Sequence, residues 1–186
     1  MIEPNAESSE KQSPFYLKNE LFCKKFEDFI SQHDGNSKGK YNAWSYLVYG
    51  KIIKPKEWAL EYKKSTFTSG NLFLSTKSQS LFVSAIWKTR TNKAFKSDFL
   101  IRKKKFTDSI LKLVNQSIKK IESHQNYILI TNRNSFEIQN LIQVLQPLFI
   151  TNEIYQITYQ KNILTIDLRT EKHYFDIFSK LIELSI

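Results

Sequence analysis

The sequence contains few glycines, which excludes most phosphate-binding loops. It has four glycines among 186 residues, and none follows Gly70. Glycine is the residue that allows positive φ and close approach of the backbone to a phosphate, so the last 116 residues encode no glycine-rich dinucleotide loop. The segment 35–40 has too few residues between its glycines for a nucleotide-binding P-loop, and Tyr41 follows where a magnesium-holding Ser or Thr is required.

Cysteine and histidine are also scarce. Cys23 is the only cysteine, so it forms no internal disulfide, and its place beside an apolar helical stripe favours a buried structural thiol. His33, His124 and His173 are far apart in sequence, and no two of them share helical spacing. We therefore predict no metal site, no cofactor and no catalytic constellation. An active site assembled from distant residues would leave no spacing pattern, so an enzyme remains an alternative.

Long apolar runs are absent as well. No stretch of about 18 apolar residues is present, and the first 14 residues are polar and acidic rather than signal-like. We predict no transmembrane segment and no secretory signal, and hence a soluble, cytoplasmic protein. Aromatic residues make up 14% of the chain, which is too many for a disordered protein. A chain of this length buries enough surface to form a hydrophobic core.

The positive charge is concentrated in the middle of the sequence. The formal net charge is +10, and residues 41–123 contain 17 basic and 5 acidic side chains, whereas the flanking segments are each close to neutral. Lysine outnumbers arginine by 24 to 4. Lysine is a hydrated point charge, whereas arginine is preferred for bidentate contacts with phosphate and guanine. The composition favours attraction to an acidic partner over base-specific recognition of nucleic acid.

Hydrophobic periodicity predicts an α+β fold. Residues 1–14 lack apolar periodicity and are predicted to be a disordered tail, followed by a single domain over residues 15–186. Within this domain we predict a helical segment over 15–63, a strand meander with a helix over 64–123, and a βαββα segment over 124–186. The predicted sheet is antiparallel or mixed, has about six to seven strands, and carries helices mainly on one face.

The bounds of the predicted elements follow from where the hydrophobic pattern changes between a helical period and a two-residue period. The segment 42–53 fits either a short helix or a buried strand, and we favour the helix. A loop is predicted over 33–40. The predicted strands are 65–68, 71–76, 81–91, 97–103 and 127–131, with a hairpin over 153–160 and 163–169. The predicted helices are 15–32, 106–123, 134–144 and 171–185.

Basic and aromatic residues cluster at the ends of two predicted strands and the start of the following helix. We call this cluster the basic rim; its members are Trp87, Lys88, Arg90, Lys93, Lys96, Arg102, Lys103, Lys104 and Lys105. Such a rim suits an acidic protein, an anionic surface or a nucleic-acid backbone, although lysines also protect sheet edges from unwanted pairing. The leading hypothesis is a non-enzymatic binding or scaffold domain whose basic rim meets an acidic partner. Non-specific nucleic-acid binding is the less favoured alternative.

The order of segments resembles an uncharacterised bacterial α+β domain that is often found on the soluble side of membrane-attached proteins. The resemblance rests on the Trp-containing stretch 42–53, on the segment Phe99-Leu100-Ile101-Arg102, and on 127–131 before a short helix, a hairpin and a Phe-rich terminal helix. It covers residues 41–186. The resemblance implies an α+β fold and assigns no catalytic residues.

Overall fold

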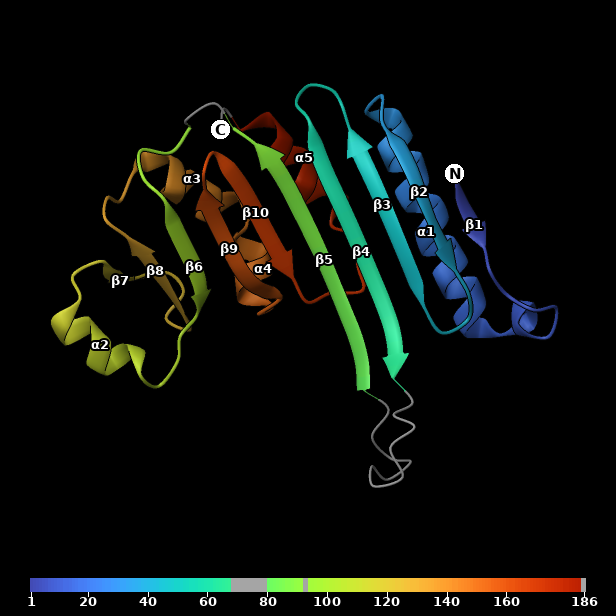
Figure 1. The fold of residues 1–186 in the computed structure, drawn as a ribbon, viewed down its shortest axis with the longest axis horizontal. Helices are drawn as coiled ribbons and strands as arrows, with labels where there is room; N and C mark the ends of the chain where they lie inside the picture. Colours follow the sequence, from blue (N-terminus) through green and yellow to red (C-terminus); the bar gives the residue numbers. More distant parts are fainter. Residues whose placement is uncertain (68–79, 92–93, 185–186) are drawn as a thin grey trace. The chain divides into compact units, whose positions relative to one another are not determined.

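The computed structural model describes residues 1–67, 80–91 and 94–184, and these contain both helices and strands, as the sequence predicts (Figure 1). Contacts between Cα atoms divide the chain into two compact units. The first unit comprises Met1–Ile86 and Thr170–His173, and the second comprises Trp87–Arg169 and Tyr174–Ile186.

Among the described residues, the first unit contains a long helix, four strands and the first part of a fifth strand, β5 (Ser80–Arg90). The strand order is β1-β2-β3-β4-β5, with β1 parallel to β2 and the pairs β2–β3 and β3–β4 antiparallel. Its other elements are β1 (Ile2–Pro4), a 3-10 helix (Glu10–Gln12), α1 (Pro14–Gln32), β2 (Asn36–Tyr41), β3 (Tyr46–Ile52) and β4 (Trp58–Phe67).

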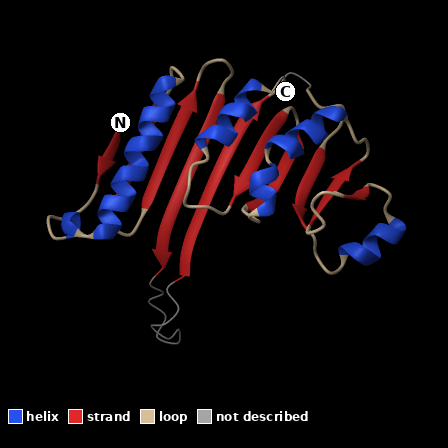
Figure 2. Ribbon diagram, turned by 180° about the vertical axis from the view of Figure 1, so that it is seen from behind, coloured by secondary structure: helices blue, strands red, loops and turns tan. Residues whose placement is uncertain are grey.

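Helix α1 confirms the helix predicted over 15–32 and covers one face of the first unit's strands (Figure 2). Pro14 occupies the first turn, and the Ser13 hydroxyl accepts a hydrogen bond from the Phe15 amide at 3.3 Å, which caps the helix. The buried stripe of α1 includes Phe26 and Ile30, which are completely inaccessible to solvent. Burial of this stripe against the sheet is the main source of stability for such a helix.

The core of the first unit lies between α1 and alternate residues of β3. The burial pattern of β3 alternates strictly, with Val48 and Gly50 facing the helix. A Cβ atom added at Gly50 would lie 2.5 Å from Cδ1 of Ile30, so the helix packs where β3 has no side chain. Across the sheet Val48 pairs with Tyr62 of β4, which is also fully buried.

The second unit contains the end of β5 and the remaining strands and helices of the chain. Its strand order is β5-β10-β9-β6-β8-β7. The pairs β10–β9, β6–β9, β6–β8 and β7–β8 are antiparallel. The elements are β6 (Phe99–Lys103), α2 (Asp108–Val114), β7 (Ile118–Lys120), β8 (Tyr127–Thr131), α3 (Phe136–Val144), α4 (Gln146–Ile150), β9 (Ile154–Gln160), β10 (Ile163–Leu168) and α5 (Phe175–Glu183).

Two features of the second unit confirm the sequence predictions. Strands β9 and β10 form the predicted hairpin, and its turn residues Lys161 and Asn162 both have positive φ, as a two-residue hairpin turn requires. Helix α5 buries Phe178, whose ring meets that of Trp87 edge-to-face with centroids 4.9 Å apart. The closing helix begins at Phe175, four residues later than predicted.

The sheet is larger than predicted, and of the two predicted strand arrangements it has the mixed one. The described residues form ten strands rather than six to seven, and the parallel pair β1–β2 makes the sheet mixed. Residues 1–14, predicted to be a disordered tail, contain β1 and the 3-10 helix, because Ile2 is buried and its amide donates to the Glu27 carboxylate at 3.2 Å. These contacts span 25 residues, so local periodicity does not reveal them.

One predicted helix is replaced by a strand, and another is shorter than predicted. The prediction of a helical segment over 15–63 is wrong beyond Gln32, because β2, β3 and part of β4 follow; the favoured helix over 42–53 is β3, and the predicted loop over 33–40 contains most of β2. The predicted helix over 106–123 ends at Val114, where Asn115 accepts hydrogen bonds from the amide and hydroxyl of Ser117 and turns the chain into β7. The predicted strand over 71–76 lies outside the described residues.

Candidate functional site

The structure separates the members of the predicted basic rim. Lys88 and Arg90 are exposed, two residues apart on β5, and Lys96 is exposed in the loop before β6. Trp87 is fully buried in the core of the second unit, so its ring cannot stack on a partner. Lys93 lies outside the described residues.

The C-terminal part of the rim lies between β6 and α2. Lys103, Lys104 and Lys105 are exposed, and the Lys104 amide donates to the Asn126 carbonyl at 2.8 Å, which joins this segment to the start of β8. Lys104 also lines a pocket of about 680 Å³ in the second unit, which we call the basic pocket. This volume falls within the range of small-ligand sites.

The basic pocket is lined by both basic and apolar side chains. Its basic members are Lys104, Lys119 and Lys120, and its apolar members include Ile118, Ile121 and Ile128. All three isoleucines are buried, whereas Lys104 and Lys120 are exposed. The pocket therefore offers an apolar surface bordered by positive charge.

Strand register places Arg102 of β6 close to two residues that line this pocket. Arg102 of β6 pairs with Ile128 of β8, which pairs in turn with Lys120 of β7. Residues aligned across a sheet project from the same face, and adjacent strands lie about 4.8 Å apart, so Arg102 and Lys120 flank Ile128 about 10 Å from each other.

Arg102 is engaged within the protein. Its Nη1 and Nη2 donate to the two carboxylate oxygens of Asp108 at 2.8 and 2.7 Å, and the Lys105 amide donates to the same carboxylate at 2.5 Å. The Asp108 side chain is 1% exposed and that of Arg102 is 20% exposed. The hydrogen bonds from Arg102 are the main cause that lowers the pKa of Asp108 to about 2. Asp108, which lines the basic pocket, is therefore ionised at neutral pH.

Lys119 and Lys120 were missed as site residues by the sequence analysis. Both fell within the predicted helix over 106–123, far from the rim, whereas the structure places them on the edge strand β7. The available signal was Asn115 followed two residues later by Ser117, a pattern that favours a turn over a helix interior.

The first unit has a second large pocket, of about 630 Å³, beside Cys23 and Glu27. Burial, with a smaller contribution from nearby carboxylates, raises the pKa of the Cys23 thiol to about 12, so this residue is a structural thiol and not a nucleophile. Glu27 accepts hydrogen bonds from the Ile2 amide and the Ser37 hydroxyl, each at 3.2 Å. The polar groups of this pocket thus hold β1 in place.

No family model matches the chain, and no curated protein matches it. Among the described residues, none of the helices has both the length and the apolar character needed to cross a membrane, and no group of three His, Cys, Asp or Glu side chains is placed to hold a metal ion.

Proposed function

We propose that this chain is a binding domain that captures an acidic partner, and that the basic pocket is where the partner docks. The observation that carries the proposal is that Lys104, Lys119 and Lys120 border one pocket while Arg102 offsets the charge of Asp108 in its wall. Glu122 also lines the pocket, so the three lysines outnumber the one acidic side chain that Arg102 does not offset, and the remaining positive charge attracts an anionic group.

The chemistry of the pocket defines the partner further. Lysine ammonium groups attract carboxylates or phosphates without demanding a fixed geometry, and the buried isoleucines favour an apolar group beside the charge. An acidic peptide that also carries an aliphatic side chain satisfies both requirements. Recognition is favoured over general acid–base catalysis because Asp108, with its pKa of about 2, does not exchange protons near neutral pH.

The proposal is tested by the fluorescence anisotropy of a labelled peptide of alternating glutamate and leucine. The variant Lys104→Glu/Lys119→Glu/Lys120→Glu should abolish binding, and the affinity of the unmodified protein should fall as salt is added, because exposed charges are screened. Circular dichroism and thermal unfolding of the variant would confirm that it is folded.

The matched control reverses the same number of charges on the predicted rim outside the pocket. Lys88→Glu/Arg90→Glu/Lys96→Glu should reduce affinity only slightly, because these residues do not line the pocket. Equal loss in the two triple variants would show that net charge, and not the pocket, governs binding. Unchanged binding in the pocket variant would overturn the proposal.

A further inference from the structure

The three strands β2, β3 and β4 of the first unit present a second surface that the proposed function does not use. Alternate residues on these strands face away from α1, and strand register aligns them in rows. One row is Lys40, Leu47 and Lys63; the next is Lys38, Tyr49 and Glu61; the third is Asn36, Lys51 and Ala59. We call these nine residues the open face.

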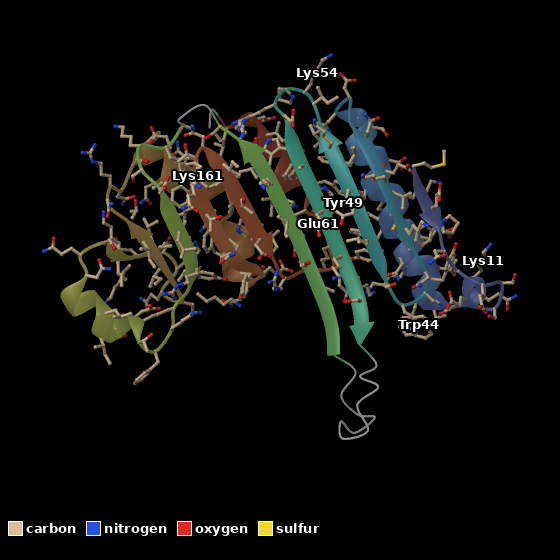
Figure 3. The ribbon with its side chains drawn as sticks, in the orientation of Figure 1. Lys11, Trp44, Tyr49, Lys54, Glu61 and Lys161 are labelled. Atoms are coloured by element: carbon tan, nitrogen blue, oxygen red, sulfur yellow. The ribbon has the colours of Figure 1, made fainter. Side chains whose placement is uncertain are left out.

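The open face is not covered by a helix among the described residues of the first unit. Helix α1 lies on the opposite face of the strands, as Figures 1 and 2 show from the two sides. Leu47 and Tyr49 are 38% and 37% exposed, although the neighbouring residues Tyr46 and Val48 on the helix side are buried. Figure 3 shows Tyr49 and Glu61 projecting from neighbouring strands on this face. The centre of the open face is thus aromatic and accessible.

Four lysines surround Tyr49. Lys38 is its direct partner on β2, and Lys51 follows it by two residues on β3. Lys40 and Lys63 are its diagonal neighbours on β2 and β4. Directly opposed residues have Cβ atoms about 5 Å apart and diagonal ones about 7 to 8 Å, so long side chains at all four positions reach the region around the ring.

The acidic side chains near this face do not cancel its charge. Glu61 is the direct partner of Tyr49 on β4, and Glu3 of β1 pairs with Lys40. Glu57 forms an ion pair with Lys51 at 3.1 Å, but both side chains are more than half exposed, and such surface pairs contribute little and exchange readily with an anionic ligand. Glu61 is consequently the acidic group closest to the aromatic centre.

We propose that the open face of the first unit binds single-stranded nucleic acid, with Tyr49 stacking on a base and the surrounding lysines contacting phosphates. A flat sheet with one accessible aromatic ring and flexible cations suits unpaired bases, because every base presents a π-face and the charges follow the backbone. Lysines without arginines on this face predict binding with little sequence preference. This surface belongs to the first unit, so the proposal is independent of the basic pocket in the second unit.

The test measures the anisotropy of fluorescein-labelled dT12 and rU12 with the full chain at several salt concentrations. Binding should weaken as salt rises, and the double variant Lys38→Gln/Lys40→Gln should reduce the slope of log K against log salt by roughly 1.4, since each phosphate contact on a single strand contributes about 0.7.

Tyr49→Leu should weaken binding by about 5- to 100-fold. Glu61→Gln should strengthen it, because the variant removes the only acidic member of the open face. Tighter binding of rU12 than of dT12 would show that the open face recognises RNA through its 2′-hydroxyl groups. Equal affinity would show that it contacts only phosphates and bases, which RNA and DNA share.

Matched controls separate stacking and face-specific contacts from general attraction. Lys24→Gln/Lys25→Gln removes the same charge from exposed positions on α1, and Tyr155→Leu removes an exposed tyrosine from the second unit; both should retain full binding. Absence of binding to either oligonucleotide at low salt would overturn the proposal. It would also be overturned if Tyr49→Leu bound normally, or if duplex DNA or anionic phospholipid vesicles bound as tightly as the single strands. The triple pocket variant Lys104→Glu/Lys119→Glu/Lys120→Glu distinguishes the two proposals, because it should lose the acidic peptide and keep the oligonucleotides.

Discussion

Replacement of Asp108 by asparagine tests the ion pair between Arg102 and Asp108 beside the basic pocket. The substitution keeps the shape of the side chain but removes its charge and replaces one acceptor oxygen by an NH2 donor, so one of the two hydrogen bonds from Arg102 is lost and the other is made to a neutral oxygen. The Lys105 amide can still donate to the amide oxygen of asparagine. The variant therefore tests the ionic, bidentate contact with Arg102 while leaving the volume of the side chain unchanged.

The magnitude follows from the pKa of Asp108. That pKa is lowered from 3.8 to about 2, mainly by hydrogen bonds from Arg102, and each pKa unit corresponds to about 1.4 kcal/mol. The Asp108 side chain is 1% exposed and that of its partner Arg102 is 20% exposed, so solvent screening reduces this figure in part. Because the folded pKa is below the unfolded one, the stabilisation is complete above about pH 5 and is lost as the pH falls toward 2. Asp108→Asn should cost about 2 to 3 kcal/mol at pH 7.

Urea unfolding of both proteins at pH 7, 5, 4 and 3, followed by circular dichroism, measures the difference. The free-energy gap between them should be constant from pH 7 to 5 and should narrow steadily below pH 4. Hydrogen exchange at the Lys105 amide, which donates to Asp108, should report the same change locally. A gap below about 1 kcal/mol at pH 7, or one that does not depend on pH, would refute the reasoning.

Three further substitutions test the first unit, each by urea unfolding. Gly50→Ala should destabilise by about 1 to 3 kcal/mol, because the new methyl group would lie 2.5 Å from Ile30; an unchanged midpoint would contradict the packing. Lys64→Met should cost about 1 to 3 kcal/mol, because the buried ammonium group contacts Glu171 at 3.0 Å, and adding Glu171→Gln should recover part of the loss. Burial lowers the pKa of His173 to about 3, so the wild-type protein should lose stability as the pH falls from 6.5 toward 3 while unfolded chains take up the proton. His173→Asn should flatten this slope between pH 7 and 5, and an identical slope would show that the group titrates normally.

Local patterns predicted the elements whose signals lie within a few residues. Helix α1 has a Ser-Pro start and an apolar stripe, and the β9–β10 hairpin has two alternating segments joined by Lys161 and Asn162. Strand β3 was misassigned because its exposed positions Leu47 and Tyr49 are apolar too, so the two-residue period of burial is absent from the hydrophobicity. A run that is apolar on both faces reads equally well as a helix.

The candidate site was predicted in part for a related reason. Lys104 belonged to the predicted rim because its neighbours in sequence are basic. Lys119 and Lys120 join it only because β7 pairs with β8, and β8 pairs with β6, across gaps that no periodicity records. The residues that line the candidate pocket are therefore brought together by long-range strand pairing. The distribution of charge along the sequence indicated only the region in which the pocket lies.

The net charge of the middle segment overstates the charge available to a partner. Arg102 is one of two arginines in the rim, and arginine is the side chain suited to bidentate anion recognition, yet Asp108 already accepts hydrogen bonds from both Nη1 and Nη2 of Arg102. Lys64 is buried against Glu171 in the same way. Partner-accessible charge depends on exposure as well as on sequence, and exposed lysines gather at the pocket of the second unit and on the open face of the first. Because these surfaces belong to different units and contain different apolar groups, charge variants confined to one of them should change binding of one class of ligand and leave the other intact.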